Sequence, residues 1–149
     1  MAEELLDDSR SPAGQGFRRW LESPNGKLVL GGKLTQELGP QRVQLLIRGL
    51  KLAGRLITIE DQKVERQAKK LTALPRGEPG ACKSNDHHII ALAQLSGARM
   101  LFSKDRDLHK DFKNKQLVDN PRGKVYSTRD SQDFTRSRRE LLRQHRCNP

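Results

Sequence analysis

Residues 84–108 read SNDHHIIALAQLSGARMLFSKDRDL. This stretch is the main basis for the fold that we predict for the chain. The apolar residues of Ile89–Ala93 follow helical spacing, and a Ser-Gly pair then ends the helix. The run Met100–Phe102 is short and apolar, as in a buried strand. The chain leaves this strand through a polar segment that holds Asp105. The pattern predicts a helix that leads into a buried strand, with an acidic side chain directly after it.

Short apolar runs and helical patterns alternate on either side of this stretch. Further strands are expected at residues 28–30, 56–59 and 124–126, each next to a glycine-containing turn. Helices are expected from Pro40 to Gly54, from a cap at Asp61 to about Leu71, and from Thr135 to about Arg146. This alternation predicts a parallel sheet with crossover helices.

Acidic residues recur where strands end or helices begin. Asp105 follows the strand at 100–102, and Asp86 is expected in the first turn of a helix capped by Ser84. Glu37 follows the strand at 28–30, on a short helix. Each acid taken alone is more commonly a helix cap or a solvated side chain. Together they are expected at the carboxyl ends of the strands, where open α/β sheets bind ligands.

Three carboxylates at one sheet edge predict a site for Mg²⁺ or Mn²⁺, because these cations prefer hard oxygen ligands. Such an ion can lower the pKa of its bound water and neutralise a phosphate under attack. Asp107 could add to the site, but we expect it to begin a helix instead. His87, His88 and His109 could bind Zn²⁺. Neighbouring helical residues, however, point about 100° apart, so we expect these histidines to be solvated or loosely packed.

The charge balance points to a polyanionic partner. The chain has 29 Lys and Arg against 18 Asp and Glu, for a formal net charge of +11. A positive field of this kind attracts nucleic acid and speeds the encounter. The alternative is a protein that is merely basic and soluble. No apolar run approaches the roughly 18 residues of a membrane span, and the acidic N-terminus does not resemble a signal peptide. We expect a cytoplasmic protein with no membrane partner.

The stretch 84–108 resembles the second half of the PIN domain family. In that family one Asp opens a helix, and a second Asp follows a strand that ends in Thr or Ser. The resemblance implies that these acids are Asp86 and Asp105, with Ser103 as the hydroxyl that supports a metal-bound water. The Glu of the family, on the helix after the second strand, falls on Glu37. This implies that Glu37, Asp86 and Asp105 are the metal ligands.

The resemblance covers roughly residues 17–147 and implies a three-layer α/β/α PIN-like fold with a parallel sheet of four or five strands. It divides the chain into a non-matching segment, a PIN-like domain, and a basic C-terminal helix and tail, at residues 1–16, 17–130 and 131–149. PIN domains begin with an apolar strand that ends in a metal-binding Asp, and residues 1–16 contain no such strand. We expect either that the true start lies upstream or that this chain is a degenerate member.

The resemblance implies a metal-dependent ribonuclease that hydrolyses RNA phosphodiester bonds. The phosphate backbone would contact four basic residues, Lys104, Arg138, Arg139 and Arg143. Many prokaryotic members are toxins restrained by an antitoxin protein, so an antitoxin is a plausible partner, and a homodimer is a further partner to consider. The alternative is a non-catalytic PIN module that binds RNA or a protein partner, which the missing first-strand Asp favours.

Overall fold

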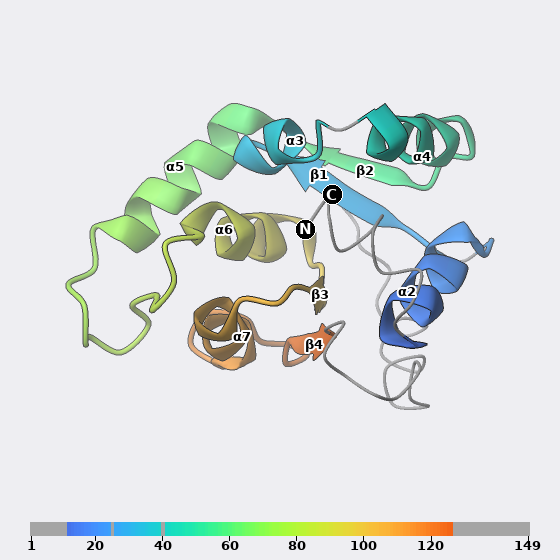
Figure 1. The fold of residues 1–149 in the computed structure, drawn as a ribbon. Helices are drawn as coiled ribbons and strands as arrows, with labels where there is room; N and C mark the ends of the chain where they lie inside the picture. Colours follow the sequence, from blue (N-terminus) through green and yellow to red (C-terminus); the bar gives the residue numbers. More distant parts are fainter. Residues whose placement is uncertain (1–11, 25, 40, 127–149) are drawn as a thin grey trace.

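Strands and helices alternate along the part of the chain that the structure describes. The computed structural model describes residues 12–24, 26–39 and 41–126 (Figure 1). Its elements are α2 (Pro12–Glu22), β1 (Leu28–Gly31), α3 (Lys33–Glu37), α4 (Gln41–Leu52), β2 (Leu56–Ile59), α5 (Asp61–Thr72), α6 (His87–Ser96), β3 (Met100–Phe102), α7 (Arg106–Lys113) and β4 (Lys124–Tyr126). The mixed α/β class predicted from the sequence is therefore confirmed. The basic helix expected from Thr135 lies outside the described residues.

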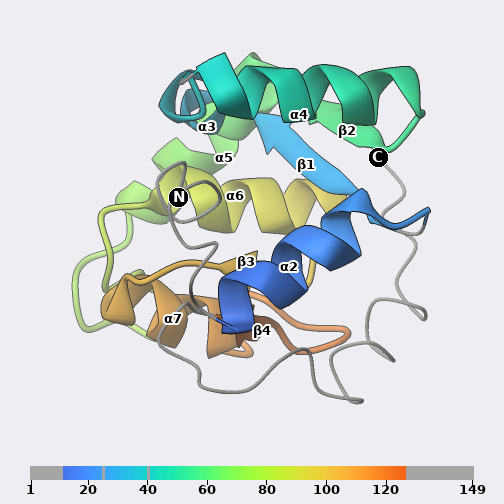
Figure 2. The ribbon, with the colours of Figure 1, turned by 45° about the vertical axis from the view of Figure 1, so that its right-hand side comes forward.

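The four described strands form two parallel pairs. Strand β1 pairs with β2, with Leu28 opposite Leu56, and strand β3 pairs with β4, with Met100 opposite Lys124. Figures 1 and 2 show helix α6 lying between the two pairs. The parallel pairing expected from the sequence is present in both sheets. A single sheet of four or five strands remains a proposal, which is taken up below.

Helix α6 forms the centre of the apolar core. Its residues from His88 to Ala93 are all buried, and it packs against α5, α3, β1 and β2. Such burial on several faces explains the apolar run from Ile89 to Ala93, since burying one large aliphatic side chain contributes about 1.5–3 kcal/mol. Gly97 ends the helix in the left-handed conformation, with φ of 74°, and donates a hydrogen bond to the Ala93 carbonyl.

Aromatic packing joins helix α2 to the second strand pair. The ring of Phe17 stacks on that of Phe102 in β3, with centroids 4.4 Å apart and planes 9° apart. Trp20 lies beside Phe17, at a centroid distance of 6.1 Å. Offset stacking of this kind adds about 0.5–1.5 kcal/mol to the area buried. No helix in the described part of the chain is long and apolar enough to cross a membrane.

Asp61 forms a long-range hydrogen bond in place of the helix cap that was expected from the sequence. Asp61 was expected to cap α5, but it is the first residue of that helix, and Glu60 occupies the cap position without a side-chain hydrogen bond. The Asp61 carboxylate instead accepts a hydrogen bond from the Gly32 amide at 2.6 Å. Gly32 has a φ of 57°, and a Cβ there would lie 2.9 Å from Val64. The turn between β1 and α3 therefore requires glycine.

Candidate functional site

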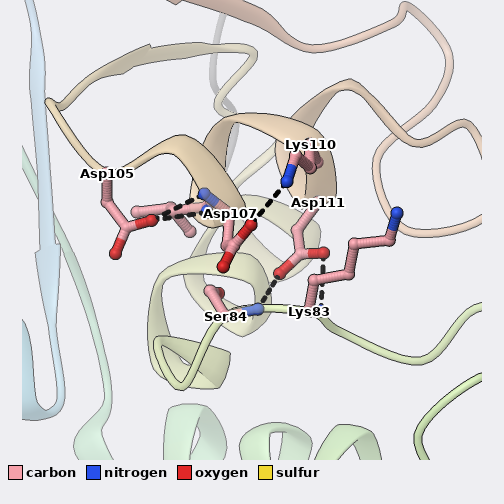
Figure 3. A network of polar contacts seen from close by, with 7 residues as sticks. Lys83, Ser84, Asp105, Asp107, Lys110 and Asp111 are labelled. Atoms are coloured by element: carbon pink, nitrogen blue, oxygen red, sulfur yellow. Dashed lines mark hydrogen bonds and ion pairs between the residues drawn. The ribbon is translucent and has the colours of Figure 1, made fainter.

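Asp105 lies directly after β3, as predicted, and caps helix α7. Its Oδ1 accepts hydrogen bonds from the amides of Asp107 and Leu108, at 2.8 and 2.9 Å. Its own amide donates to the Oγ of Ser103 at 3.1 Å. Figure 3 shows the second carboxylate oxygen pointing away from these amides. One oxygen of Asp105 therefore stabilises the helix start, and the other is directed elsewhere.

Asp86 occupies the N-cap position of α6, so the helix begins two residues later than expected from the sequence. The predicted cap was Ser84, but the helix begins at His87, and the Asp86 side chain forms no cap hydrogen bond. The Ser84 hydroxyl instead accepts a long hydrogen bond of 3.4 Å from the Asp86 amide. The half-buried Asp86 therefore lies at the positive end of the α6 dipole, but its carboxylate does not cap the helix through a hydrogen bond.

Glu37 is the last residue of α3, and its carboxylate lies against the first turn of α6. Its Oε1 is 3.4 Å from Nε2 of His88 and 3.9 Å from Nζ of Lys33. His88 is buried, so the expectation that it is solvated or loosely packed was wrong. The reason is that α6 is enclosed on several sides, so that even a polar position in its first turn points inward.

Asp111 is a buried carboxylate that the sequence reasoning missed. It lies on α7 and is 2% exposed. Its Oδ1 accepts a hydrogen bond from the Lys83 amide and its Oδ2 accepts one from the Ser84 amide, both at 2.8 Å. Figure 3 shows this carboxylate holding the segment that leads into α6. A signal was present in the sequence, because Asp111 lies three residues after Leu108 and beside Phe112, on the apolar face of the helix.

Two further ionisable groups in this region have shifted pKa values. Burial, and secondly the charge of Asp111, raises the pKa of the Cys82 thiol to about 11. The exposed Asp107 carboxylate accepts a hydrogen bond from Lys110 at 2.7 Å, and this bond is the main reason that its pKa is lowered. Asp107 lies in the first turn of α7, as expected for a residue that begins a helix.

The predicted site residues lie on elements that contact one another. Glu37 reaches the first turn of α6, two residues beyond Asp86, while α7 carries the Asp105 cap at its start and binds Ser84 through Asp111. However, the described part of the chain contains no group of three or more His, Cys, Asp and Glu side chains that could hold a metal ion.

The remaining predicted residues differ in what the structure says of them. Ser103 is buried, and its carbonyl lies 2.6 Å from Nε2 of His109. Lys104 is exposed beside it. The predicted phosphate-binding arginines Arg138, Arg139 and Arg143 lie outside the described residues. Comparison with protein-family models, with curated proteins and with solved structures gave no match.

Proposed function

We propose that the chain is a PIN-type nuclease domain that hydrolyses RNA phosphodiester bonds with Mg²⁺ or Mn²⁺. The observation that carries the proposal is that two acids each stand at the start of a helix. Asp105 follows β3, and Asp86 precedes α6 with a carboxylate that closes no cap. Helix α7 connects the two positions. It begins after the Asp105 cap, and its Asp111 accepts a hydrogen bond from the Ser84 amide, two residues before Asp86. The net charge of +11 supports a polyanionic substrate.

The finer fold that accompanies this function is a three-layer α/β/α sandwich. In this proposal the pairs β1–β2 and β3–β4 belong to one parallel sheet of four or five strands. Support comes from the shared parallel pairing and from the acids that follow β1 and β3. Glu37 lies on the helix after β1, and Asp105 lies directly after β3.

The residues present suit a hard divalent cation. Mg²⁺ commonly uses only one or two protein carboxylates and keeps several waters, so Asp86 and Asp105 would be enough as ligands. Glu37, proposed as a third, forms no three-ligand group with them in the described part of the chain. The bound ion would activate a water and neutralise charge on the phosphate. The Ser103 hydroxyl accepts a hydrogen bond from the Asp105 amide and would orient that water through its own proton. Lys104 and the C-terminal arginines would position the phosphate backbone by their charge.

The second candidate is a non-catalytic PIN module that binds RNA or a protein partner. Two observations favour it. The described residues hold no group of three potential ligands, and Oδ1 of Asp105 is occupied by two backbone amides. In this alternative the acids stabilise helix ends, and the basic surface alone contacts the partner.

A metal titration and an RNA cleavage assay distinguish the two candidates. Asparagine caps helices as well as aspartate, so Asp105→Asn should keep the α7 cap while removing the charge. Millimolar Mn²⁺ should raise the melting temperature of the wild type through binding to the native state. The double variant Asp86→Asn, Asp105→Asn should lose both this rise and Mn²⁺-dependent cleavage of single-stranded RNA.

The matched control is Asp107→Asn, which removes the same charge two residues away. It should leave the Mn²⁺ response intact, because Asp107 is bound to Lys110. An equal Mn²⁺-induced rise in melting temperature in the double variant would reject the proposed site. A normal metal response without any cleavage would favour the non-catalytic module.

A further inference from the structure

His88 carries a buried nitrogen with no hydrogen bond. Among the residues that the structure describes, its Nε2 is the one buried side-chain polar atom that lacks a hydrogen-bond partner, and the residue is 9% exposed. Buried polar groups in folded proteins almost always have a partner, and each exception calls for an explanation such as a water or an ion. The charged group that faces this nitrogen is the Glu37 carboxylate.

We propose that Nε2 of His88 and Oε1 of Glu37 are ligands of one divalent transition-metal ion, such as Mn²⁺, Co²⁺ or Zn²⁺. The site lies where the end of α3 meets the first turn of α6. The inference rests on the proposed function, because Glu37 is one of its metal-binding residues. It adds a nitrogen ligand, and with it a preference among metals.

The distance between the two atoms fits a shared ion better than a direct hydrogen bond. The separation of 3.4 Å exceeds the usual N–H···O range of about 2.7–3.2 Å. Two ligands that each lie about 2.1 Å from a tetrahedral ion are about 3.4 Å apart. The Glu37 side chain is 40% exposed and the His88 side chain only 10%, so solvent would reach the ion from the Glu37 side. Waters or phosphate oxygens can fill its remaining coordination positions.

The nitrogen ligand determines which metals are favoured. Imidazole suits ions such as Zn²⁺, Cu²⁺, Fe²⁺ and Ni²⁺, whereas carboxylate, carbonyl and water oxygens suit Mg²⁺ and Mn²⁺. The nitrogen ligand therefore favours Zn²⁺ among the ions named, and Mn²⁺ serves below as the probe whose bound nitrogen can be detected. An ion held by only two side chains binds weakly and takes its other ligands from solution. This agrees with the absence of any three-ligand group in the described part of the chain. An ion bound this weakly raises the melting temperature little, and the larger Mn²⁺-induced rise still reports on Asp86 and Asp105.

Lys33 is the competitor for this site. Its Nζ lies 3.9 Å from the same Glu37 oxygen, and its side chain is 68% exposed. Without an ion, the lysine supplies the positive charge that partly neutralises Glu37. Because the lysine side chain is long and exposed, it can move into solvent when a cation binds. Removing the charge of Lys33 should therefore strengthen metal binding.

The test is Mn²⁺ binding to the full chain, followed by pulsed electron paramagnetic resonance, which detects ¹⁴N nuclei bound to Mn²⁺. The wild type should show nitrogen modulation at saturating Mn²⁺. His88→Gln should lose it and bind Mn²⁺ about tenfold more weakly or worse, with Mg²⁺ affinity unchanged. The matched control is His87→Gln, one residue earlier on α6, which should retain the modulation. Lack of modulation in the wild type, or its persistence in His88→Gln, would overturn the proposal in favour of a plain histidine–glutamate ion pair.

A surface variant keeps the test decisive if His88→Gln does not fold. Lys33→Met should tighten Mn²⁺ binding, whereas Lys27→Met, another exposed lysine, should not. Equal effects of these two substitutions would reject the site. The same experiments distinguish a failure of the metal site from a failure of the proposed nuclease function. Nitrogen modulation without RNA cleavage leaves the metal site standing, and cleavage that depends on Asp86 and Asp105 without modulation leaves the nuclease standing.

Discussion

At the scale of single residues, Asp111 does the most to shape the region around Asp86. Its two carboxylate oxygens each accept a backbone amide, from Lys83 and Ser84, and Ser84 lies two residues before Asp86. Hydrogen bonds to an ionised acceptor are stronger than neutral ones. A charge buried on α7 therefore fixes the path of the segment that enters α6, and with it the position of the Asp86 carboxylate.

Removing this carboxylate should be strongly destabilising. Asp111→Ala leaves two backbone amides without acceptors, that of Ser84 buried and that of Lys83 partly buried, and the loss of a buried hydrogen-bond partner costs about 1–3 kcal/mol. We expect the free energy of unfolding to fall by about 2–4 kcal/mol in urea denaturation. Asp111→Asn, which keeps one acceptor oxygen, should lose less. The exposed Asp119 provides the control, and Asp119→Asn should change the stability little. Equal losses at positions 111 and 119 would contradict the role assigned to the buried carboxylate.

Cys82 should be chemically inert in the folded protein. Burial is the main cause of the rise of its pKa to about 11, and the negative charge of Asp111 is the second. Only the thiolate reacts with alkylating agents, so at pH 8 the native thiol should react far more slowly than the same thiol in urea. The measurement uses Cys147→Ser, which leaves Cys82 as the sole cysteine. Rapid alkylation of the folded protein at pH 8 would contradict the predicted inertness of Cys82.

The same pKa shift predicts how stability depends on pH. The folded thiol keeps its proton up to about pH 11, whereas the unfolded thiol loses it near its ordinary value of 9. The unfolded state therefore binds fewer protons between these two pH values, and the contribution of Cys82 to stability is present below pH 9 and declines as pH rises toward 11. Replacing Cys82 by Ala should flatten this part of the stability profile.

At the scale of elements, local signals predicted the regular structure and missed the contacts between elements. Strand β1 and helix α4 were predictable because apolar periodicity and flanking glycines are properties of neighbouring residues. The buried His88, the cap at Asp86 and the bond from Gly32 to Asp61 were not. Each depends on which element packs on which, and no short-range pattern records that.

Two glycines in helical contexts should respond to alanine in opposite directions. Gly49 lies inside α4, and a Cβ there would meet nothing within 4 Å. Gly49→Ala should raise the free energy of unfolding by about 0.5–1 kcal/mol, because glycine is a poor helix former. Gly97 also has open space, but its φ is +74°, so Gly97→Ala should lower it by about 1–2 kcal/mol. Thermal or urea unfolding measures both, and changes of the same sign would contradict the backbone argument.

At the scale of the whole molecule, the net charge of +11 is the property that the sequence reveals most directly. The candidate site was predicted less completely. Asp86 and Asp105 could be placed at helix starts from sequence because both follow turn or strand signals. Their relation to Glu37 could not, because α3 is positioned by its packing on α6 and β1. The charge therefore predicts a polyanionic partner, and the packing of the helices decides where the acids lie.

The final prediction concerns where this charge acts. Affinity for single-stranded RNA should fall with salt by about 0.7 log units per neutralised phosphate for each log unit of salt. Replacing Arg138, Arg139 and Arg143 by Gln should flatten that slope, because fewer counterions are then released on binding. The matched control replaces Lys63, Lys69 and Lys70 of α5 by Gln and lowers the net charge equally. If only the arginine variant flattens the slope, the C-terminal arginines contact the phosphates. Equal flattening in both variants would mean that RNA binding depends on the total positive charge and not on these arginines. No binding at low salt would reject RNA as the partner.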